Sequence, residues 1–502
     1  MSQSIPFVRP CPTDRIPGRG LQRSVAVALL AILVACASTE PGVPKGDPQR
    51  PVADADAYIP RIRQLAAQGD ASAQYALGRL FLTGRGVRED KTKALYWIRR
   101  AAEQDMAPAQ ETLGAMYDQG NGVESDYAEA AHWYRLAAIQ GRPKAQFRLG
   151  TLYKEGLGVA QDEALALDLY RRAAEQGLAP AQLELGIHFR NPGGEQDHAE
   201  AVKWFRLAAD QGLGPAQFNL GLAYALGQGV TQDDAEAASW YRKAAENGIA
   251  PAQNNLGAMY KNGHGVPRDL GEAAKWYRLA AEQGNSVGQY NFAVAVGYGR
   301  GVPRDLAQAR EWYRRSAEQG FADAQNNLGA FYLRGVGMDP DYAEALKWYR
   351  RAAAQGHPRA LHSLGYMYRT GRGVERDHVE AVEWYRKAAD RGLALAQLWL
   401  GLMHRYGQGV SQDDSEAAAW FRLAAEQGNA TGQLNLGLLY ASGTGVPQDL
   451  VEAYKWLSLA VSRVEEDQRD DAIAIRDKTA AEMNSDQLVE GRHRVLEWER
   501  DR

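Results

Sequence analysis

Residues 252–284, AQNNLGAMYKNGHGVPRDLGEAAKWYRLAAEQG, contain the pattern that decides the fold. Ala252, Leu256 and Tyr260 recur every four residues and therefore form one stripe on a helix. The glycines of GHGV end that helix, and Asp269 precedes a second helical stretch in which small and aromatic residues recur. Two short helices with one apolar side each cannot bury that side alone, so the unit needs neighbours of the same kind.

The same pattern recurs along most of the chain. A Leu-Gly pair marks each unit, and successive pairs are 36 residues apart, except for one step of 35 and one double step in which Ala293 replaces the glycine. The glycines of these pairs are Gly78, Gly114, Gly150, Gly186, Gly221, Gly257, Gly329, Gly365, Gly401 and Gly437. A fixed period over such a length predicts about eleven stacked repeats.

Residues that cap helices stand at the expected places. Pro251 opens the first helix, where a missing N–H costs nothing. Glu272 follows Asp269 by three residues, which is the spacing of a capping box. In the second helix a Trp such as Trp276 recurs in ten of the eleven units, and we expect it to be buried between neighbouring units. The Arg after Trp-Tyr is expected on a solvated surface, paired with an acidic residue four positions later, as Arg278 with Glu282.

The motifs A-Q-x-x-L-G, G-x-G-V-x-x-D and A-x-x-W-Y resemble those of the Sel1-like repeat family, which is related to the tetratricopeptide repeats. The resemblance implies an all-α fold, a right-handed α-solenoid of about eleven 36-residue helix–turn–helix repeats with N- and C-terminal capping helices. It also implies a concave groove and a role as an adaptor or scaffold. Some secreted members are stapled by disulfides, whereas this chain has only Cys11 and Cys36, both near its start, so packing must hold the repeats.

The N-terminal residues are typical of a bacterial lipoprotein signal. Several arginines precede an apolar run, residues 24–35, that is shorter than the ~20 residues a helix needs to span a bilayer. The run ends in LVAC at residues 33–36, which resembles a lipobox, and Cys36 is therefore the predicted lipidation site; an ordinary signal peptide is the alternative. Ala37 is not the Asp that usually retains such lipoproteins at the inner membrane, which favours the periplasm with a lipid anchor in the outer membrane.

These observations divide the chain into four parts. They are a lipoprotein signal peptide (1–35), a disordered tether rich in Pro and Gly (36–53), the repeat solenoid (54–464) and C-terminal capping helices (465–502). Residues 54–68 look like a lone second helix that precedes the first unit, and 466–482 and 485–500 are polar amphipathic stretches suited to closing the last apolar face.

Composition and motifs argue against several kinds of chemistry. The net charge is −4, so no basic excess suggests nucleic acid as a partner. The nine His residues do not pair at metal-ligand spacing, no nucleophile signature occurs, and the G-x-G loops follow helices rather than strands. We therefore predict no catalytic residue, no metal and no cofactor, and the chain is not expected to be an enzyme.

One column suggests a binding role. The residue before the Leu of the first helix is an asparagine in five repeats: Asn219, Asn255, Asn291, Asn327 and Asn435. An amide donates and accepts hydrogen bonds, so in the groove of a related solenoid it would hold the backbone of an extended peptide. The alternative is that each Asn bonds a neighbouring helix or loop within the array.

The resulting hypothesis is an envelope-anchored scaffold or adaptor that binds proteins or extended peptides along its concave groove. The alternative is a polysaccharide- or peptidoglycan-associated lipoprotein that assists envelope assembly or export, with a glycan as partner. In that case aromatic residues such as Tyr290 and Trp399 would stack on sugars.

Overall fold

The computed structural model describes residues 55–191, 195–464 and 466–500, and this part of the chain contains 25 helices and no strand. The predicted signal peptide, Cys36 and the whole of the tether lie outside the described residues. Residues 192–194 of the fourth repeat also lie outside them; they belong to the loop NPGG, which stands where other repeats have G-x-G. The helices belong to two compact units, Met1–Gln104 and Asp105–Arg502, each of which is described by itself.

The described part of unit 1, residues 55–104, contains three helices that pack in chain order: α2 (Ala55–Ala67), α3 (Ala71–Thr83) and α4 (Lys91–Ala102). The stretch expected to be a lone second helix is α2, and it buries Ile62 and Ala66. The Nε2 of Gln74 on α3 donates to the carbonyl oxygen of Ala66 at 3.2 Å, which joins α2 to the first full repeat.

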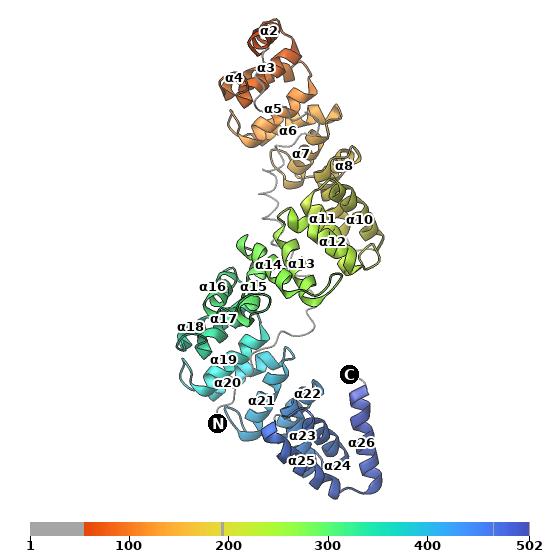
Figure 1. Cartoon of the computed structure of the whole chain (residues 1–502), viewed down its shortest axis with the longest axis vertical. Helices are drawn as coiled ribbons and strands as arrows, with labels where there is room; N and C mark the ends of the chain where they lie inside the picture. Colours follow the sequence, from red (N-terminus) through yellow and green to blue (C-terminus); the bar gives the residue numbers. More distant parts are fainter. Residues whose placement is uncertain (1–54, 192–194, 465, 501–502) are drawn as a thin grey trace. The chain divides into compact units, whose positions relative to one another are not determined.

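Unit 2 holds the remaining helices, and from α5 to α25 each packs against the next along the chain (Figure 1). They are α5 (Ala107–Gln119), α6 (Tyr127–Ile139), α7 (Pro143–Glu155), α8 (Glu163–Glu175), α9 (Ala179–Arg190), α10 (Glu195–Asp210), α11 (Gly214–Leu226), α12 (Asp234–Glu246), α13 (Ala250–Asn262), α14 (Leu270–Glu282), α15 (Ser286–Tyr298), α16 (Leu306–Glu318), α17 (Ala322–Arg334), α18 (Tyr342–Ala354), α19 (Pro358–Thr370), α20 (His378–Ala389), α21 (Ala394–Tyr406), α22 (Asp414–Glu426), α23 (Ala430–Ser442), α24 (Leu450–Val461), α25 (Glu466–Ala481) and α26 (Ser485–Arg500). The odd-numbered helices from α3 to α23 are the first helices of the repeats, and the even-numbered ones from α4 to α24 are the second helices. The predicted all-α solenoid of repeats is confirmed.

The core between the two helices of a repeat is built on the residue that follows the Trp, not on the Trp itself. Tyr277 is 3% exposed, whereas Trp276 is half-buried, so the expectation for Trp276 was wrong. The Trp is buried in only three repeats, at Trp240, Trp348 and Trp456. The ring of Tyr277 lies against Gly257 of the paired first helix, where a Cβ would come within 2.8 Å of the ring. The glycine of the Leu-Gly pair is therefore required by close packing with this ring.

The predicted capping box forms only on its aspartate side. The Asp377 carboxylate accepts from the N–H groups of Val379 and Glu380 at 2.9 and 3.0 Å. Its own N–H donates to the carbonyl oxygen of Tyr368 at 3.0 Å, so the Glu380 side chain is not needed there. Instead, Glu380 accepts from the indole Nε1 of Trp384 at 2.8 Å. The spacing of Asp and Glu thus serves two separate contacts, one of which holds the half-buried Trp.

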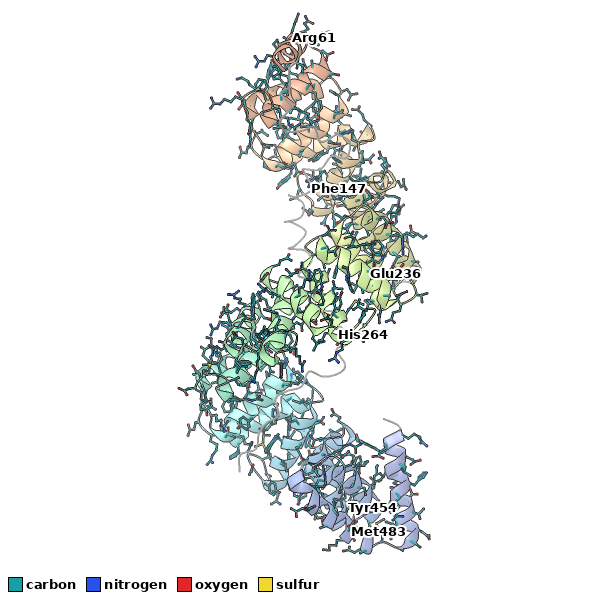
Figure 2. The ribbon with its side chains drawn as sticks, in the orientation of Figure 1. Arg61, Phe147, Glu236, His264, Tyr454 and Met483 are labelled. Carbon is teal, nitrogen blue, oxygen red and sulfur yellow. The ribbon has the colours of Figure 1, made fainter. Side chains whose placement is uncertain are left out.

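The two glycines of a G-x-G loop have different structural roles. Gly263 ends α13 in the left-handed conformation, with φ +77°. Gly265 is also left-handed, at +66°, and its Cα lies against the first turn of α12, where a Cβ would be 2.0 Å from the carbonyl oxygen of Asp234. The residue between them, His264, is exposed (Figure 2). The second glycine is therefore a contact between successive repeats.

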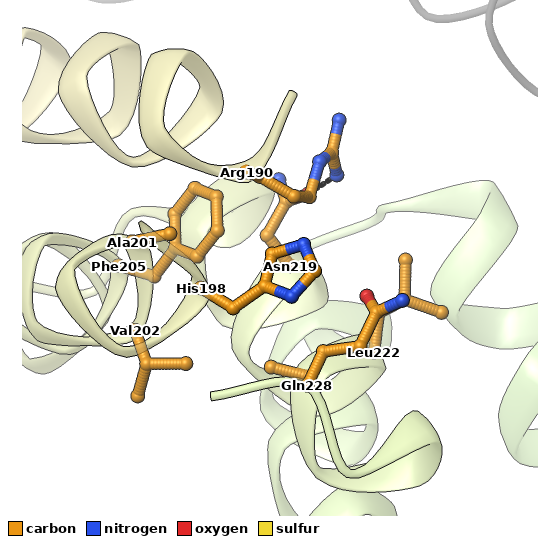
Figure 3. A pocket seen from close by; sticks show the side chains of 9 residues that line it. Arg190, His198, Ala201, Val202, Phe205, Asn219, Leu222 and Gln228 are labelled. Carbon is orange, nitrogen blue, oxygen red and sulfur yellow. Dashed lines mark hydrogen bonds between the residues drawn. The ribbon is translucent and has the colours of Figure 1, made fainter. Parts of the chain in front are cut away.

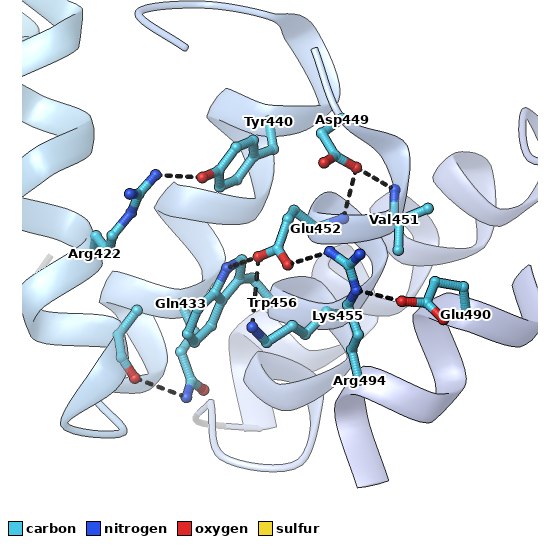
Figure 4. A network of polar contacts seen from close by, with 11 residues as sticks. Arg422, Gln433, Tyr440, Asp449, Val451, Glu452, Lys455, Trp456, Glu490 and Arg494 are labelled. Atoms are coloured by element: carbon cyan, nitrogen blue, oxygen red, sulfur yellow. Dashed lines mark hydrogen bonds and ion pairs between the residues drawn. The ribbon is translucent and has the colours of Figure 1, made fainter. Parts of the chain in front are cut away.

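The two C-terminal stretches expected to cover the last repeat are α25 and α26, and both pack on α24. Figure 4 shows the polar contacts that hold α26 in place. Glu452 of α24 accepts from Trp456 Nε1 at 2.8 Å and from Arg494 of α26 at 2.7 Å. Gly491 lies against the ring of Tyr454, close to Met483, and both of these residues are labelled in Figure 2. The Glu–Trp contact found in other repeats is thus extended here by an arginine from the terminal helix.

Candidate functional site

The first helices of unit 2 present one half-buried side. On α13 this side consists of Pro251, Asn254, Asn255, Ala258 and Lys261, which share one arc of the helix. The opposite arc, including the Leu-Gly pair, is buried against the second helix. We call the half-buried arc, at equivalent positions of α5 to α23, the first-helix face. Because its residues are neither required by the core nor fully exposed, it is the surface on which binding residues can vary.

A buried ladder of glutamines runs beside this face. Gln253 donates from Nε2 to the carbonyl oxygen of Ala245 in the preceding repeat at 3.1 Å, and its Oε1 accepts from Gln283 of its own repeat at 2.7 Å. The first-helix glutamines of the ladder are Gln74, Gln110, Gln146, Gln182, Gln217, Gln253, Gln289, Gln325, Gln397 and Gln433. In the ninth repeat Leu361 replaces this glutamine, and Arg391 replaces its partner.

Both glutamine columns are present in the repeat motif, as Gln253 and Gln283 in the sixth repeat, but the sequence alone predicted no role for them. The signal was present in the sequence, because both amides are lost together in the ninth repeat, and only the eleventh repeat keeps its first-helix glutamine, Gln433, with a different residue, Arg463, at the partner position. A buried amide needs a partner, so the two substitutions in the ninth repeat leave no unpaired group behind. The ladder is therefore part of the scaffold and not of the binding surface.

Two residues of the asparagine column are held by arginines from the preceding repeat. Asn435 accepts from Nη1 of Arg405 at 3.1 Å and donates to the carbonyl oxygen of Thr431 at 2.8 Å. Asn219 likewise accepts from Arg190 and donates to the carbonyl oxygen of Pro215 at 2.8 Å. These amides contact the neighbouring first helix, which is the alternative considered for the column.

The three central asparagines lie in clusters of amides. Asn291 on α15 donates from Nδ2 to Oδ1 of Asn254 on α13 at 2.8 Å, and Asn254 donates to Asn255 at 3.4 Å. On α17 the Nδ2 of Asn326 donates to Asn327 at 3.2 Å. Asn255, Asn291 and Asn327 are half-buried. The structure thus brings Asn255 and Asn291 together across two repeats, while Asn219 and Asn435 lie in other first helices.

Burial dominates the electrostatics beneath the central amides. It raises the pKa of Tyr241 to about 12, an effect that the Asn255 amide opposes more weakly. Tyr313, beneath Asn327, also has a raised pKa because it is buried. Both phenols are therefore neutral, so the groups beneath Asn255 and Asn327 add no charge to the amides.

The arginine column of the second helices connects repeats. Arg314 and Arg350 donate to the hydroxyl oxygens of Tyr332 and Tyr368 in the next first helix at 2.8 and 3.1 Å. Arg278 instead pairs with Glu282 at 2.7 Å, as expected from the sequence. The difference arises because the tyrosine that Arg278 would reach, eighteen residues later, is Val296 in the divergent seventh repeat. The expected surface pairing is thus correct for Arg278 but not for the column.

A small pocket lies between α9, α10 and α11 (Figure 3). The residues that line it are Arg190, His198, Ala201, Val202, Phe205, Asn219, Leu222, Ala223 and Gln228. Arg190 and Asn219 hydrogen-bond each other at its edge, and burial lowers the pKa of Arg190. Arg190 and Asn219 therefore already serve a contact between repeats.

The two aromatic residues considered for sugar stacking both pack within the array. Tyr290 meets Tyr313 and Phe321 edge to face, with ring centroids 5.8 and 5.2 Å apart. Trp399 stacks on Tyr385 at 6.3 Å with an interplanar angle of 13°. Among the described residues, no helix is both long and apolar enough to cross a membrane, and no three His, Cys, Asp or Glu side chains gather as metal ligands.

In unit 2, the stack of helix pairs joined by buried amides places the chain among the helical-repeat solenoid proteins. The Sel1 repeat model matches eleven segments, and the chain belongs to this family. The matched segments are residues 71–106, 107–141, 143–178, 179–213, 214–249, 250–285, 286–321, 322–357, 358–393, 394–429 and 430–463. Sel1 repeat proteins are generally protein-interaction scaffolds, and the fold is typically non-catalytic.

Two solved structures illustrate the likeness. The chain is 37% identical to c5321, a protective antigen present in uropathogenic Escherichia coli strains; the match covers 88% of this chain and 94% of that one, with a TM-score of 0.79. It is 31% identical to a Sel1 repeat protein from Oxalobacter formigenes over 48% of this chain and 96% of that one, with a TM-score of 0.44. No curated protein matches the sequence.

Proposed function

We propose that this Sel1 repeat protein is an envelope-anchored scaffold whose first-helix face binds an extended segment of a partner protein. The observation that carries the proposal is the amide cluster of Asn254, Asn255 and Asn291, which crosses two successive repeats. Amides recognise a peptide backbone without regard to its side chains, because each one both donates and accepts. The half-buried position limits the conformations of the amides before binding, which lowers the entropic cost of association.

We predict that replacing Asn255 and Asn327 together by alanine weakens partner binding about tenfold and changes the free energy of unfolding by less than about 1 kcal/mol. The reason is that both side chains are half-buried and their amides make long contacts. Binding is measured with a photo-crosslinking residue in place of Ala258, followed by mass spectrometry. The same residue in place of Lys275 on α14 reports contacts outside the face.

Asn262→Ala is the matched control, because Asn262 is an exposed asparagine at the end of the same helix. Crosslinks to a reproducible protein segment from position 258, reduced by the double variant and not by the control, support the proposal. If the double variant unfolds the array, the asparagines are structural. If wall fragments or polysaccharide are captured instead of protein, the glycan alternative replaces a protein partner.

The anchoring part of the proposal rests on the sequence before the described residues. The LVAC run at residues 33–36 resembles a lipobox, and acyl chains on Cys36 would attach the mature chain to a membrane, which we propose is the outer membrane facing the periplasm. The similar E. coli protein is described as a protective antigen, which agrees with a location outside the cytoplasm.

We expect full-length protein made in cells fed labelled palmitate to carry the label and Cys36→Ala protein to lose it. Cys11→Ala is the control, since Cys11 is the only other cysteine and precedes the expected cleavage point. Fractionation of the two membranes then reports which one holds the protein. Label that never appears, or that persists in Cys36→Ala, contradicts the anchor and leaves the binding proposal intact.

A further inference from the structure

The first-helix face changes its charge towards the C-terminal repeats. Helices α19, α21 and α23 contain no aspartate or glutamate, and they carry Arg359, Arg369 and Arg405. Arg372 follows α19 in the adjoining loop and is exposed. The whole chain has a net charge of −4, so this positive surface runs against the balance of the protein.

Two cations near the first helices of earlier repeats are neutralised. Lys154 on α7 pairs with Glu184 on α9 at 2.7 Å, and Arg142 pairs with Glu111 at 3.0 Å. In contrast, Arg369, Arg372 and Arg405 form no ion pair within the described residues. Lys154 stands at the position on α7 that Arg369 and Arg405 occupy on α19 and α21, so this position holds an internal ion pair in the third repeat and, in the ninth and tenth, arginines that form no ion pair with a described residue.

Arg369 is held in place by aromatic rings. Its guanidinium lies 4.0 Å from the ring centroid of Trp399, and its Nε donates to the hydroxyl of Tyr385 at 3.3 Å. Trp399 in turn stacks on Tyr385, so the arginine rests on a rigid pair of rings. A guanidinium that is fixed before binding loses little side-chain entropy when it meets a carboxylate.

The second arginine, Arg405, is held in place by Asn435 of the asparagine column. Arg405 donates to Oδ1 of Asn435 through Nη1, which leaves the other guanidinium nitrogens for a ligand. Arg372 lies over the ring of Tyr366 at 5.3 Å and flanks the same surface. We call Tyr366, Arg369, Arg372, Trp399 and Arg405 the arginine surface.

Two neighbouring groups do not alter this charge. His362 lies against the ring of Tyr385 at 5.3 Å, and burial, helped by Arg369, lowers its pKa to about 4, so it is uncharged at neutral pH. Asp323 on α17 is the only carboxylate on the first helices from α11 to α23, and it pairs with His357 at 3.2 Å. The arginine surface therefore has no internal partner of opposite charge on these helices.

We propose that the arginine surface binds an acidic, extended segment of the partner protein, with carboxylates on Arg369 and Arg405. This inference rests on the proposed function and names the chemistry of its ligand. Neighbouring helices lie about 10 Å apart, and an extended chain advances about 3.3 Å per residue, so carboxylates roughly three residues apart match successive first helices. A planar guanidinium group donates two parallel hydrogen bonds to a carboxylate, and the aromatic rings beneath Arg369 exclude water from one side.

The test uses the mature full-length chain and two fluorescent peptides of about twelve residues, which span about 40 Å when extended. One has Asp or Glu at every third position, and the other has Asn or Gln at the same positions. Fluorescence anisotropy at low ionic strength should show the acidic peptide binding at least about tenfold more tightly than the amide peptide.

Arg369→Gln with Arg405→Gln should lower the affinity for the acidic peptide at least about tenfold and leave binding of the amide peptide unchanged. The control pair is Arg172→Gln with Arg278→Gln, which removes the same charge from exposed, ion-paired positions on second helices. The control should change the affinity less than about twofold. Substitution of both surface arginines by lysine, which keeps the charge, should restore part of the binding and guards against a folding defect in the glutamine pair.

Several outcomes overturn the inference. If the acidic peptide does not bind, or if the arginine and control pairs weaken it equally, the arginine surface does not read acidic protein segments. If the two peptides bind equally well, backbone binding on the first-helix face survives and only the inference about charge fails. If a polyuronate or a single-stranded oligonucleotide binds more tightly per charge than the peptide, the ligand is an acidic glycan or nucleic acid instead of a protein.

Discussion

Tyr385→Ala should lower the free energy of unfolding by about 3–5 kcal/mol, the range for truncating a buried aromatic residue. Tyr385 is 0% exposed, and its ring fills the space above Gly365 of the paired first helix. Removal of the ring leaves a cavity that the glycine cannot fill. Urea unfolding followed by circular dichroism measures the change.

Trp276→Ala provides the comparison, because Trp276 is larger but only half-buried. Its loss should cost about half as much, in proportion to the apolar area that it buries. A cost for Trp276→Ala equal to or greater than that for Tyr385→Ala would contradict the assignment of the core to the residue after the Trp.

Gly265→Ala is expected to destabilise the array by about 2–5 kcal/mol, although it adds a single methyl group. Two effects combine: an L-residue is strained at the φ of +66° found here, and the new Cβ would lie 2.0 Å from the carbonyl oxygen of Asp234. Since that oxygen belongs to the backbone of α12, the clash is relieved only by moving one repeat away from the next. Thermal and urea unfolding both report the change.

Gly337→Ala separates the two effects. Gly337 occupies the equivalent place in the eighth repeat with φ +70°, but a Cβ there would be 3.7 Å from Leu306. Only the backbone strain then remains, and we expect a cost of about 1–2 kcal/mol. If the two glycine variants were equally destabilised, the contact between the loop and the preceding repeat would not contribute to stability.

The periodicity was sufficient to predict the helix pairs, because the apolar stripe, the helix-capping residues and the Leu-Gly pair each reflect a local requirement of the helical backbone. It could not decide which of two adjacent aromatic residues is buried. Trp276 and Tyr277 are about 100° apart on a helix, and both are apolar enough for a core. The choice depends on the angle at which the first helix crosses, which the spacing of the motif does not contain.

The candidate site was predicted less completely than the fold. The column of asparagines was correctly placed on the first helices, but a column gives no information about neighbours. Asn435 meets an arginine because Arg405 stands one repeat earlier, whereas Asn255 meets another amide because Asn254 precedes it. The contacts that cross repeats, Arg405 with Asn435 and Asn254 with Asn291, join residues 30 or more positions apart, and the pattern of a single repeat cannot reveal them.

The glutamine ladder also bears on how a chain of this kind changes its length during evolution. Most first-helix glutamines meet an alanine carbonyl behind them and an amide at the end of their own repeat, as Gln253 and Gln325 do, so these partners are nearly the same from unit to unit. Loss or duplication of one whole period therefore creates a junction in which every buried amide finds its usual partner. A deletion of any other length leaves buried amides unpaired. Insertions and deletions of whole repeats are therefore favoured over those of other lengths. The length of the binding surface then changes by one repeat at a time.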